Sequence, residues 1–229
     1  EGKEHITVSQ KLYYDPTDDL SVLVYGSTFF MNTYDLIQDM TFSQARDWTA
    51  GAKLTYHVKD WFSVTGSLHA DFYDRFKRHE RIDTRNKDYE SSIWQPRLTI
   101  TSNYFDGHSL IFGVEHTSDE LTSDRFSGNA NHDLKTRALK ETEYFLQDEW
   151  TINPKWMVSA GLRTNFSKAF GFMGMPKIAA KYSPNERWSI RANYSMGYRS
   201  PSIKELFFNW DHLGMFMIRG NENMQPEKN

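Results

Sequence analysis

The stretch "RWSIRANYSMGYRSP", residues 187–201, alternates so regularly between bulky and polar or small side chains that it predicts a β-strand. One face carries Trp188, Ile190, Ala192, Tyr194, Met196 and Tyr198, and the other carries Ser189, Arg191, Asn193, Ser195, Gly197 and Arg199. A strand of about 11 residues is roughly twice the usual length in a soluble domain. It is long enough, when tilted, to cross a bilayer. The apolar face could therefore meet either a dry core or lipid.

The composition of the 229 residues favours an all-β fold and argues against nucleic-acid binding. Twelve Tyr, 16 Phe and 7 Trp supply strand-favouring, amphipathic rings. The formal net charge of -3 lacks the basic excess that nucleic acid requires. The absence of cysteine excludes disulfides and thiolate metal sites. No run of 18 apolar residues occurs, which excludes a transmembrane helix, but the alternating strands of a transmembrane barrel would escape that test.

Short polar turns divide the chain into strand pairs, and we count about ten strands. We expect tight turns at residues 15–19, 59–60, 105–108, 153–155 and 184–186. Between these hairpins we expect long polar loops at residues 35–47, 75–90, 118–135 and 166–174. Short turns at one end and long loops at the other are typical of outer-membrane barrels. A soluble sandwich would have loops of mixed length at both ends.

Aromatic residues mark one level of the predicted sheet. They stand next to the short turns: Trp61, Trp156 and Trp188 follow a turn, and Tyr14, Tyr104, Trp150 and Tyr182 precede one. Amphipathic rings at one level favour a membrane interface. The apolar faces should also lack Lys and Arg, because each such charge costs about 2–4 kcal/mol at the bilayer midplane. The sequence therefore predicts an antiparallel transmembrane β-barrel with a wet lumen, although the strand at residues 21–31 is apolar on both faces and does not fit this pattern.

Three segments resemble TonB-dependent outer-membrane receptors. The first, "EYFLQDEWTINPKWMVSAGLR" (143–163), is similar to paired barrel strands of that family. The second, "PKIAAKYSPNERWSIRANYSMGYRSPSIKELF" (176–207), is similar to the hairpin with the FRAP-type box, here Tyr198, Arg199, Ser200 and Pro201. The third, "GNENMQPEKN" (220–229), resembles the NPxL-PE box, with Asn221, Met224, Pro226 and Glu227 at matching positions.

The resemblance implies a plugged barrel of about 22 strands in the outer membrane of a Gram-negative bacterium. Such a receptor imports a scarce nutrient, for example an iron-siderophore or haem, without a resident cofactor. The TonB–ExbB–ExbD complex drives import, and in some branches a surface lipoprotein caps the receptor. We expect residues 1–229 to be a partial barrel domain, with the plug, the TonB contact and the remaining strands outside this sequence. A passive porin is the alternative, but porins lack the two boxes.

His212, in "NWDHLGMF", is a candidate haem ligand. It lies between the two boxes, where the haem branch of the family carries a histidine, and a neutral imidazole is a good axial ligand for iron. A loop histidine without a ligand is the other interpretation. No other histidine has the spacing of a metal site. No motif suggests an enzyme, since acidic pairs such as Asp148 and Glu149 point to opposite faces of a strand.

Overall fold

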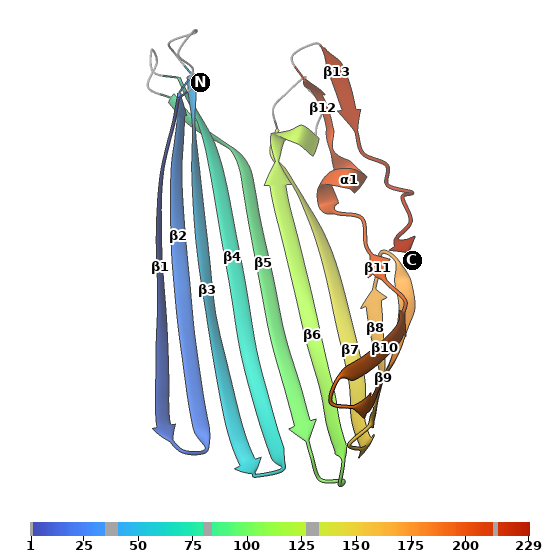
Figure 1. The fold of residues 1–229 in the computed structure, drawn as a ribbon. Helices are drawn as coiled ribbons and strands as arrows, with labels where there is room; N and C mark the ends of the chain where they lie inside the picture. Colours follow the sequence, from blue (N-terminus) through green and yellow to red (C-terminus); the bar gives the residue numbers. More distant parts are fainter. Residues whose placement is uncertain (1, 35–40, 80–83, 127–132, 213–214) are drawn as a thin grey trace.

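Ten antiparallel strands form one sheet in the computed structural model, which describes residues 2–34, 41–79, 84–126, 133–212 and 215–229. They are β1 (Gly2–Thr17), β2 (Leu20–Tyr34), β3 (Thr41–Lys59), β4 (Phe62–His79), β5 (Thr84–Ser102), β6 (His108–Ser123), β7 (Lys135–Asn153), β8 (Trp156–Ser167), β9 (Gly171–Asn185) and β10 (Trp188–Ser195). Each strand pairs with the next in sequence, so the sheet order is the chain order. Figure 1 shows them side by side as a curved wall with the short turns at the lower end.

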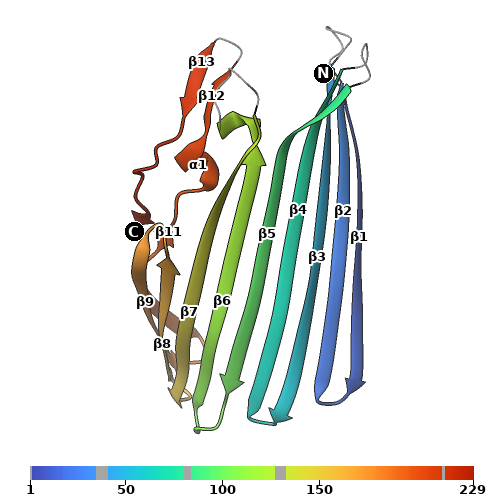
Figure 2. The ribbon, with the colours of Figure 1, turned by 180° about the vertical axis from the view of Figure 1, so that it is seen from behind.

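Smaller elements lie outside this wall. They are the 3-10 helix η2 (Asp124–Phe126), the helix α1 (Ile203–Phe207) and the short strands β11 (Tyr198–Arg199), β12 (Asn209–His212), β13 (Phe216–Arg219) and β14 (Glu227–Lys228). Figures 1 and 2 both show α1 beside β6 and β7, towards the end of the wall opposite the short turns. Among the described residues, no helix has the length and apolar character needed to cross a membrane.

The register confirms the predicted division into two faces. Leu162 lies opposite Leu146 on one side and Pro176 on the other, so apolar residues of neighbouring strands form one continuous face. On the same face, Ile178 is 53% exposed and Leu12 is 65% exposed. Large apolar side chains that no other protein layer covers are suited to lipid as the solvent. We therefore call this side the lipid face and the opposite side the lumen face.

Two aromatic rows border the lipid face. Near the short turns, the ring centroids of Trp61 and Tyr104 are 4.9 Å apart, and those of Trp156 and Tyr182 are 4.3 Å apart. Towards the other end, Phe30 packs on Trp48 and Phe72 packs on Trp94, at 5.5 and 5.3 Å. The ten residue steps from Phe62 to Phe72 span roughly 33 Å along a strand. At a tilt of about 40° this is about 25 Å, the height of an outer-membrane apolar band.

The predicted loops are in the right places but too long. β3 already begins at Thr41 and β4 continues to His79, within segments that we expected to be loops. Likewise, β6 continues to Ser123 and β9 begins at Gly171. The hydrogen-bond ladder is made by the backbone, so polar side chains on both faces do not end a strand. The strands therefore run beyond the apolar band.

The stretch 187–201 is not one continuous strand. β10 ends at Ser195, and Met196 donates one more backbone hydrogen bond to Pro176 of β9, at 3.1 Å. The next amide, of Gly197, donates instead to the carbonyl of Asn229, at 3.0 Å. The alternation continues past Ser195 because the chain stays extended, but its pairing partner changes.

The strand at residues 21–31, which is apolar on both faces, lies within β2, and a contact inside the sheet explains one of its inward aromatic rings. Tyr25 points to the lumen face, where its ring covers Gly51, its direct partner on β3. A Cβ atom on Gly51 would lie 2.2 Å from this ring, so the aromatic side chain fills the space above a residue without a side chain. The Tyr25 hydroxyl also lies 3.0 Å from Nδ1 of His69 on β4. The inward ring therefore packs against the wall itself.

Candidate functional site

The two family-like boxes meet in space. β11 pairs with β14 in antiparallel fashion, with Tyr198 opposite Lys228 and Arg199 opposite Glu227. Nη1 of Arg199 lies 3.2 Å from Oε1 of Glu227, and its Nη2 lies 2.6 Å from Oε1 of Glu205. We call this contact between residues 198–201 and 221–227 the box junction. The remaining predicted box residues flank it: Ser200 and Pro201 follow β11, and Asn221, Met224 and Pro226 precede β14.

A capped helix follows the first box directly. Ser202 is the N-cap of α1, where its Oγ accepts a hydrogen bond from the amide of Glu205 and its own amide donates to the Glu205 carboxylate, at 2.8 Å. The Ser202 amide, followed by the guanidinium of Arg199, lowers the pKa of Glu205 from 4.5 to about 2. The carboxylate is therefore ionised at any physiological pH, and it links the cap to the box junction.

The segment that begins at the cap is anchored on the lumen face, and we call residues 202–212 and 215–220 the inward segment. Ile203 is 2% exposed and forms a small core with Phe208 and with Phe126 of η2. Tyr89 of β5 and Leu121 of β6 complete this core. Both belong to the lumen face, because their odd positions alternate with the lipid-facing residues of the same strands. The inward segment thus lies inside the curve of the wall.

Cations of η2 and β7 hold the aromatic side chains of the inward segment. The guanidinium carbon of Arg125 lies 4.0 Å from the ring centre of Trp210, and that of Arg137 lies 5.0 Å from Phe207. The segment returns past α1 through Gly220, whose amide donates to the carbonyl of Phe208. A Cβ atom on Gly220 would lie 2.5 Å from the backbone of Leu206, so only glycine permits this close approach.

An outer hollow of about 420 Å³ opens where the inward segment meets β7. Arg137 and Arg219 line it together with Phe207, Asn209 and Glu222. Guanidinium groups beside an aromatic ring can bind an anion that also carries flat groups. Sequence reasoning did not single out Arg137 or Arg219, because they are far apart in the chain and belong to no motif.

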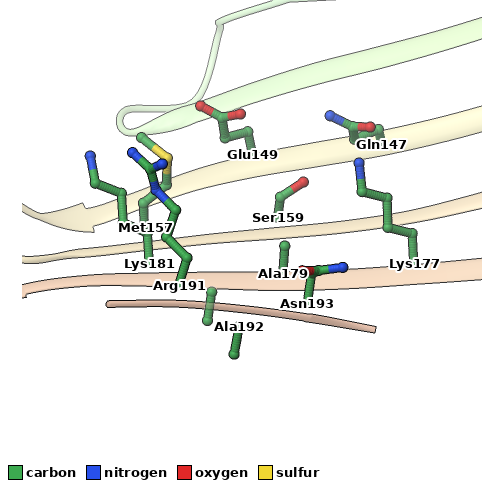
Figure 3. A pocket seen from close by; sticks show the side chains of 11 residues that line it. Gln147, Glu149, Met157, Ser159, Lys177, Ala179, Lys181, Arg191, Ala192 and Asn193 are labelled. Atoms are coloured by element: carbon green, nitrogen blue, oxygen red, sulfur yellow. The ribbon is translucent and has the colours of Figure 1, made fainter. Parts of the chain in front are cut away.

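A second hollow, of about 520 Å³, lies on the lumen face of β7 to β10, and Figure 3 shows its lining. Lys177, Lys181 and Arg191 contribute positive charge there, and Lys181 and Arg191 are direct cross-strand partners. Like charges in such positions repel each other. Glu149 also lines the hollow. Elsewhere on this face some cations have a direct carboxylate partner, as Arg163 has in Glu143. We call this the cationic hollow, and its chemistry suits anions.

The structure tests the predicted ligand residues only partly. The backbone of His212 ends β12, opposite Phe216 of β13, while its side chain lies outside the described part of the chain. Met224 donates its amide to the carbonyl of Asn221 in the turn before β14, at 3.0 Å. No cluster of three or more His, Asp or Glu side chains that could hold a metal ion occurs among the residues described.

Comparison of the sequence with models of known protein families assigns the chain to one of them. Residues 5–229 match the family model described as "TonB dependent receptor-like, beta-barrel". The chain belongs to the TonB-dependent receptors. The predicted outer-membrane location in a Gram-negative bacterium and the predicted antiparallel barrel architecture are thereby confirmed. The family comprises receptors and transporters rather than enzymes, and membership favours a receptor over the porin alternative.

Relatives of this receptor barrel are distant. An iron-regulated outer membrane virulence protein of Vibrio cholerae is 24% identical over 177 residues, which is 75% of this chain and 25% of that protein. The chain thus spans about a quarter of the length of the curated relatives that it matches.

Solved structures share the fold of this receptor barrel. The siderophore receptor PirA of Pseudomonas aeruginosa has a TM-score of 0.75 at 12% identity, with 99% of this chain and 41% of that chain covered. A mutant of the ferric enterobactin receptor PfeA from the same species has a TM-score of 0.79 at 12% identity, with 99% and 39% covered. The FrpB iron transporter of Neisseria meningitidis has a TM-score of 0.68 at 11% identity, with 87% and 38% covered. At such identities the likeness shows the fold alone.

Proposed function

We propose that the complete receptor takes up an iron-siderophore complex across the outer membrane, driven by the TonB–ExbB–ExbD complex. The names of its relatives support this proposal, because they describe iron-regulated, siderophore-binding and iron-transporting proteins. The ten strands would form part of a larger plugged barrel of about 22 strands. In the described sheet the outer edges of β1 and β10 have no wall strand beside them, and lipid cannot satisfy such edges.

The outer hollow is the observation that carries the proposal. It lies on the lumen side, away from the short turns, because the box junction and the buried Ile203 fix the inward segment there. Short turns face the periplasm in this architecture, so the hollow is open to ligands that arrive from outside. Arg137 and Arg219 would bind the oxygen anions of a ferric chelate, while Phe207 packs against its flat groups.

Uptake of labelled iron by cells that carry the complete receptor tests this proposal. We expect uptake from at least one iron-siderophore, and loss of that uptake when TonB is deleted. Arg137→Gln and Arg219→Gln should each weaken ligand binding about tenfold, the effect of losing a charge-assisted hydrogen bond of roughly 1.5 kcal/mol. Arg187→Gln, in the β9–β10 turn, is the matched control and should bind like the wild type. Uptake that persists without TonB would instead support a passive porin.

Haem is the second ligand to test in the same cells. If haem is the cargo, its uptake requires TonB and its Soret band shifts on binding in a manner that His212→Ala abolishes. TonB-dependent uptake of a siderophore alone would leave His212 without a role in ligand binding. A surface lipoprotein that caps the receptor remains a prediction, which co-purification with the complete receptor would test.

A further inference from the structure

A polar pair interrupts the lipid face near the short turns. His108 begins β6 and Asp148 lies on β7, and Nδ1 of His108 is 2.8 Å from Oδ2 of Asp148. Both belong to the lipid face, because they alternate along their strands with Leu110 and Leu146. Their other neighbours on this face are apolar, as shown by Ala160 opposite Asp148. An ionisable pair in such a position suggests a function.

The pair sits at the level of lipid headgroups. Trp150, which belongs to the aromatic row beside the short turns, lies opposite His108 and stacks on its ring, with centroids 5.2 Å apart and an interplanar angle of 11°. Interfacial rings of this kind mark the boundary between headgroups and hydrocarbon. The side chains of His108 and Asp148 remain 30% and 33% exposed, while Oδ1 of Asp148 is buried without a hydrogen-bond partner, so access from the lipid side is to the remaining atoms of the pair.

The hydrogen bond fixes what the pair can bind. A carboxylate only accepts, so the imidazole donates its Nδ1–H to Asp148, and in the neutral imidazole Nε2, on the far side of the ring, is left with a lone pair. Nε2 has no hydrogen-bond partner within the described ranges. With a neutral imidazole the pair carries one negative charge and presents acceptors only. Its complement is a cation with an N–H donor.

We propose that Nε2 of His108, with the Asp148 carboxylate behind the ring, accepts a hydrogen bond from the primary ammonium of an ethanolamine phospholipid headgroup. An ammonium has three N–H donors and the charge that balances Asp148. A choline headgroup carries the same charge without any N–H, so the site discriminates between the two lipids. The short turns of such barrels face the periplasm, so the bound lipid comes from the inner leaflet. The inference concerns the outside of the barrel and does not depend on the transported ligand.

Native mass spectrometry of the complete receptor, incubated with ethanolamine or choline lipids of identical chains, tests this inference. The wild type should retain the ethanolamine lipid about tenfold more than the choline lipid. Asp148→Asn should reduce its retention to the choline level. Asp106→Asn, which removes the same charge from the nearby β5–β6 turn, should behave like the wild type.

A lipid series makes the test independent of any variant. Retention by the wild type should persist with the monomethyl and dimethyl headgroups, which keep an N–H, and should be lost with the trimethyl headgroup, which has none. Equal retention along the series would overturn the proposal and show that the pair is solvated by water. Retention unchanged by Asp148→Asn would overturn it as well. Either result would leave siderophore uptake untouched.

Discussion

Arg199 and Glu227 lie opposite each other in the β11–β14 pair, and their side chains form an ion pair at 3.2 Å. The same guanidinium contacts Glu205 of α1 at 2.6 Å. One residue of the first box therefore holds both the second box and the helix between them. The box junction closes the two ends of a long connection and leaves its middle, the inward segment, on the lumen face.

Replacing Arg199 with Gln should loosen this closure, because both carboxylates lose their cation. We expect faster amide hydrogen exchange in α1 and in residues 227–229, with no change in β1 to β9. Exchange measured by mass spectrometry on the complete receptor gives the comparison. Arg187→Gln removes the same charge from a short turn and is the control. If both variants exchange like the wild type, Arg199 does not hold the junction.

Gly220→Ala should displace the inward segment from α1. The added Cβ would lie 2.5 Å from the Leu206 carbonyl and 2.7 Å from the Phe207 amide, so backbone must move. Overpacking of this kind costs about 1–3 kcal/mol, and we expect the free energy of local opening around α1 to fall by that amount. Gly66→Ala is the control, since nothing lies within 4 Å of its added Cβ. Equal protection in both variants would contradict the close approach.

Acid should weaken the helix cap. The folded-state pKa of Glu205 is lowered from 4.5 to about 2, so its stabilising effect is fully present above pH 4.5 and is lost as the pH falls towards 2. Amide exchange in α1, corrected for the intrinsic pH dependence, should rise over that window. Glu205→Gln should raise exchange at neutral pH and remove the Glu205 part of the pH dependence. A wild-type profile in the variant would show that another group titrates.

A charge on the lipid face should be far more harmful than one on the lumen face. Leu162→Arg places a cation between apolar neighbours near the middle of the band, at a cost of about 2–4 kcal/mol in the free energy of folding into a bilayer. Thr99→Arg, on the lumen face of β5, should change that free energy little. Equilibrium unfolding in lipid vesicles measures both. Equal destabilisation would mean that the two faces are wrongly assigned.

The ten-stranded wall was predictable because the sequence features that specify it lie within single strands and turns. The alternation around Ile190 and Leu162 predicted their common face, and the turns of a few polar residues predicted the hairpins. Strand ends were predicted less well, as at Thr41 and His79, because a strand with polar side chains on both faces has the same composition as a loop. The inward ring of Tyr25 was also missed, since its partner Gly51 lies on the next strand.

The candidate site was much less predictable. The resemblance identified Arg199 and Glu227 as box residues but gave no indication that they form an ion pair. Arg137 and Arg219 line the same hollow because Ile203 and Phe208 are buried against the lumen face. Contacts of this kind depend on tertiary packing, which neither composition nor periodicity encodes. The side chain of His212 lies outside the described ranges, so its role as a haem ligand stays a prediction.

The order of the strands also bears on how the wall is made. Because every wall strand is hydrogen-bonded to its neighbour in sequence, each hairpin can form from a short stretch of chain without waiting for a distant partner. Closing each short loop then costs little conformational entropy. A sheet whose contacts join residues close in sequence has a low contact order, which favours fast folding. Assembly can proceed by adding one hairpin after another to a growing edge, while the first strand keeps the opposite edge for the closing strands of the barrel.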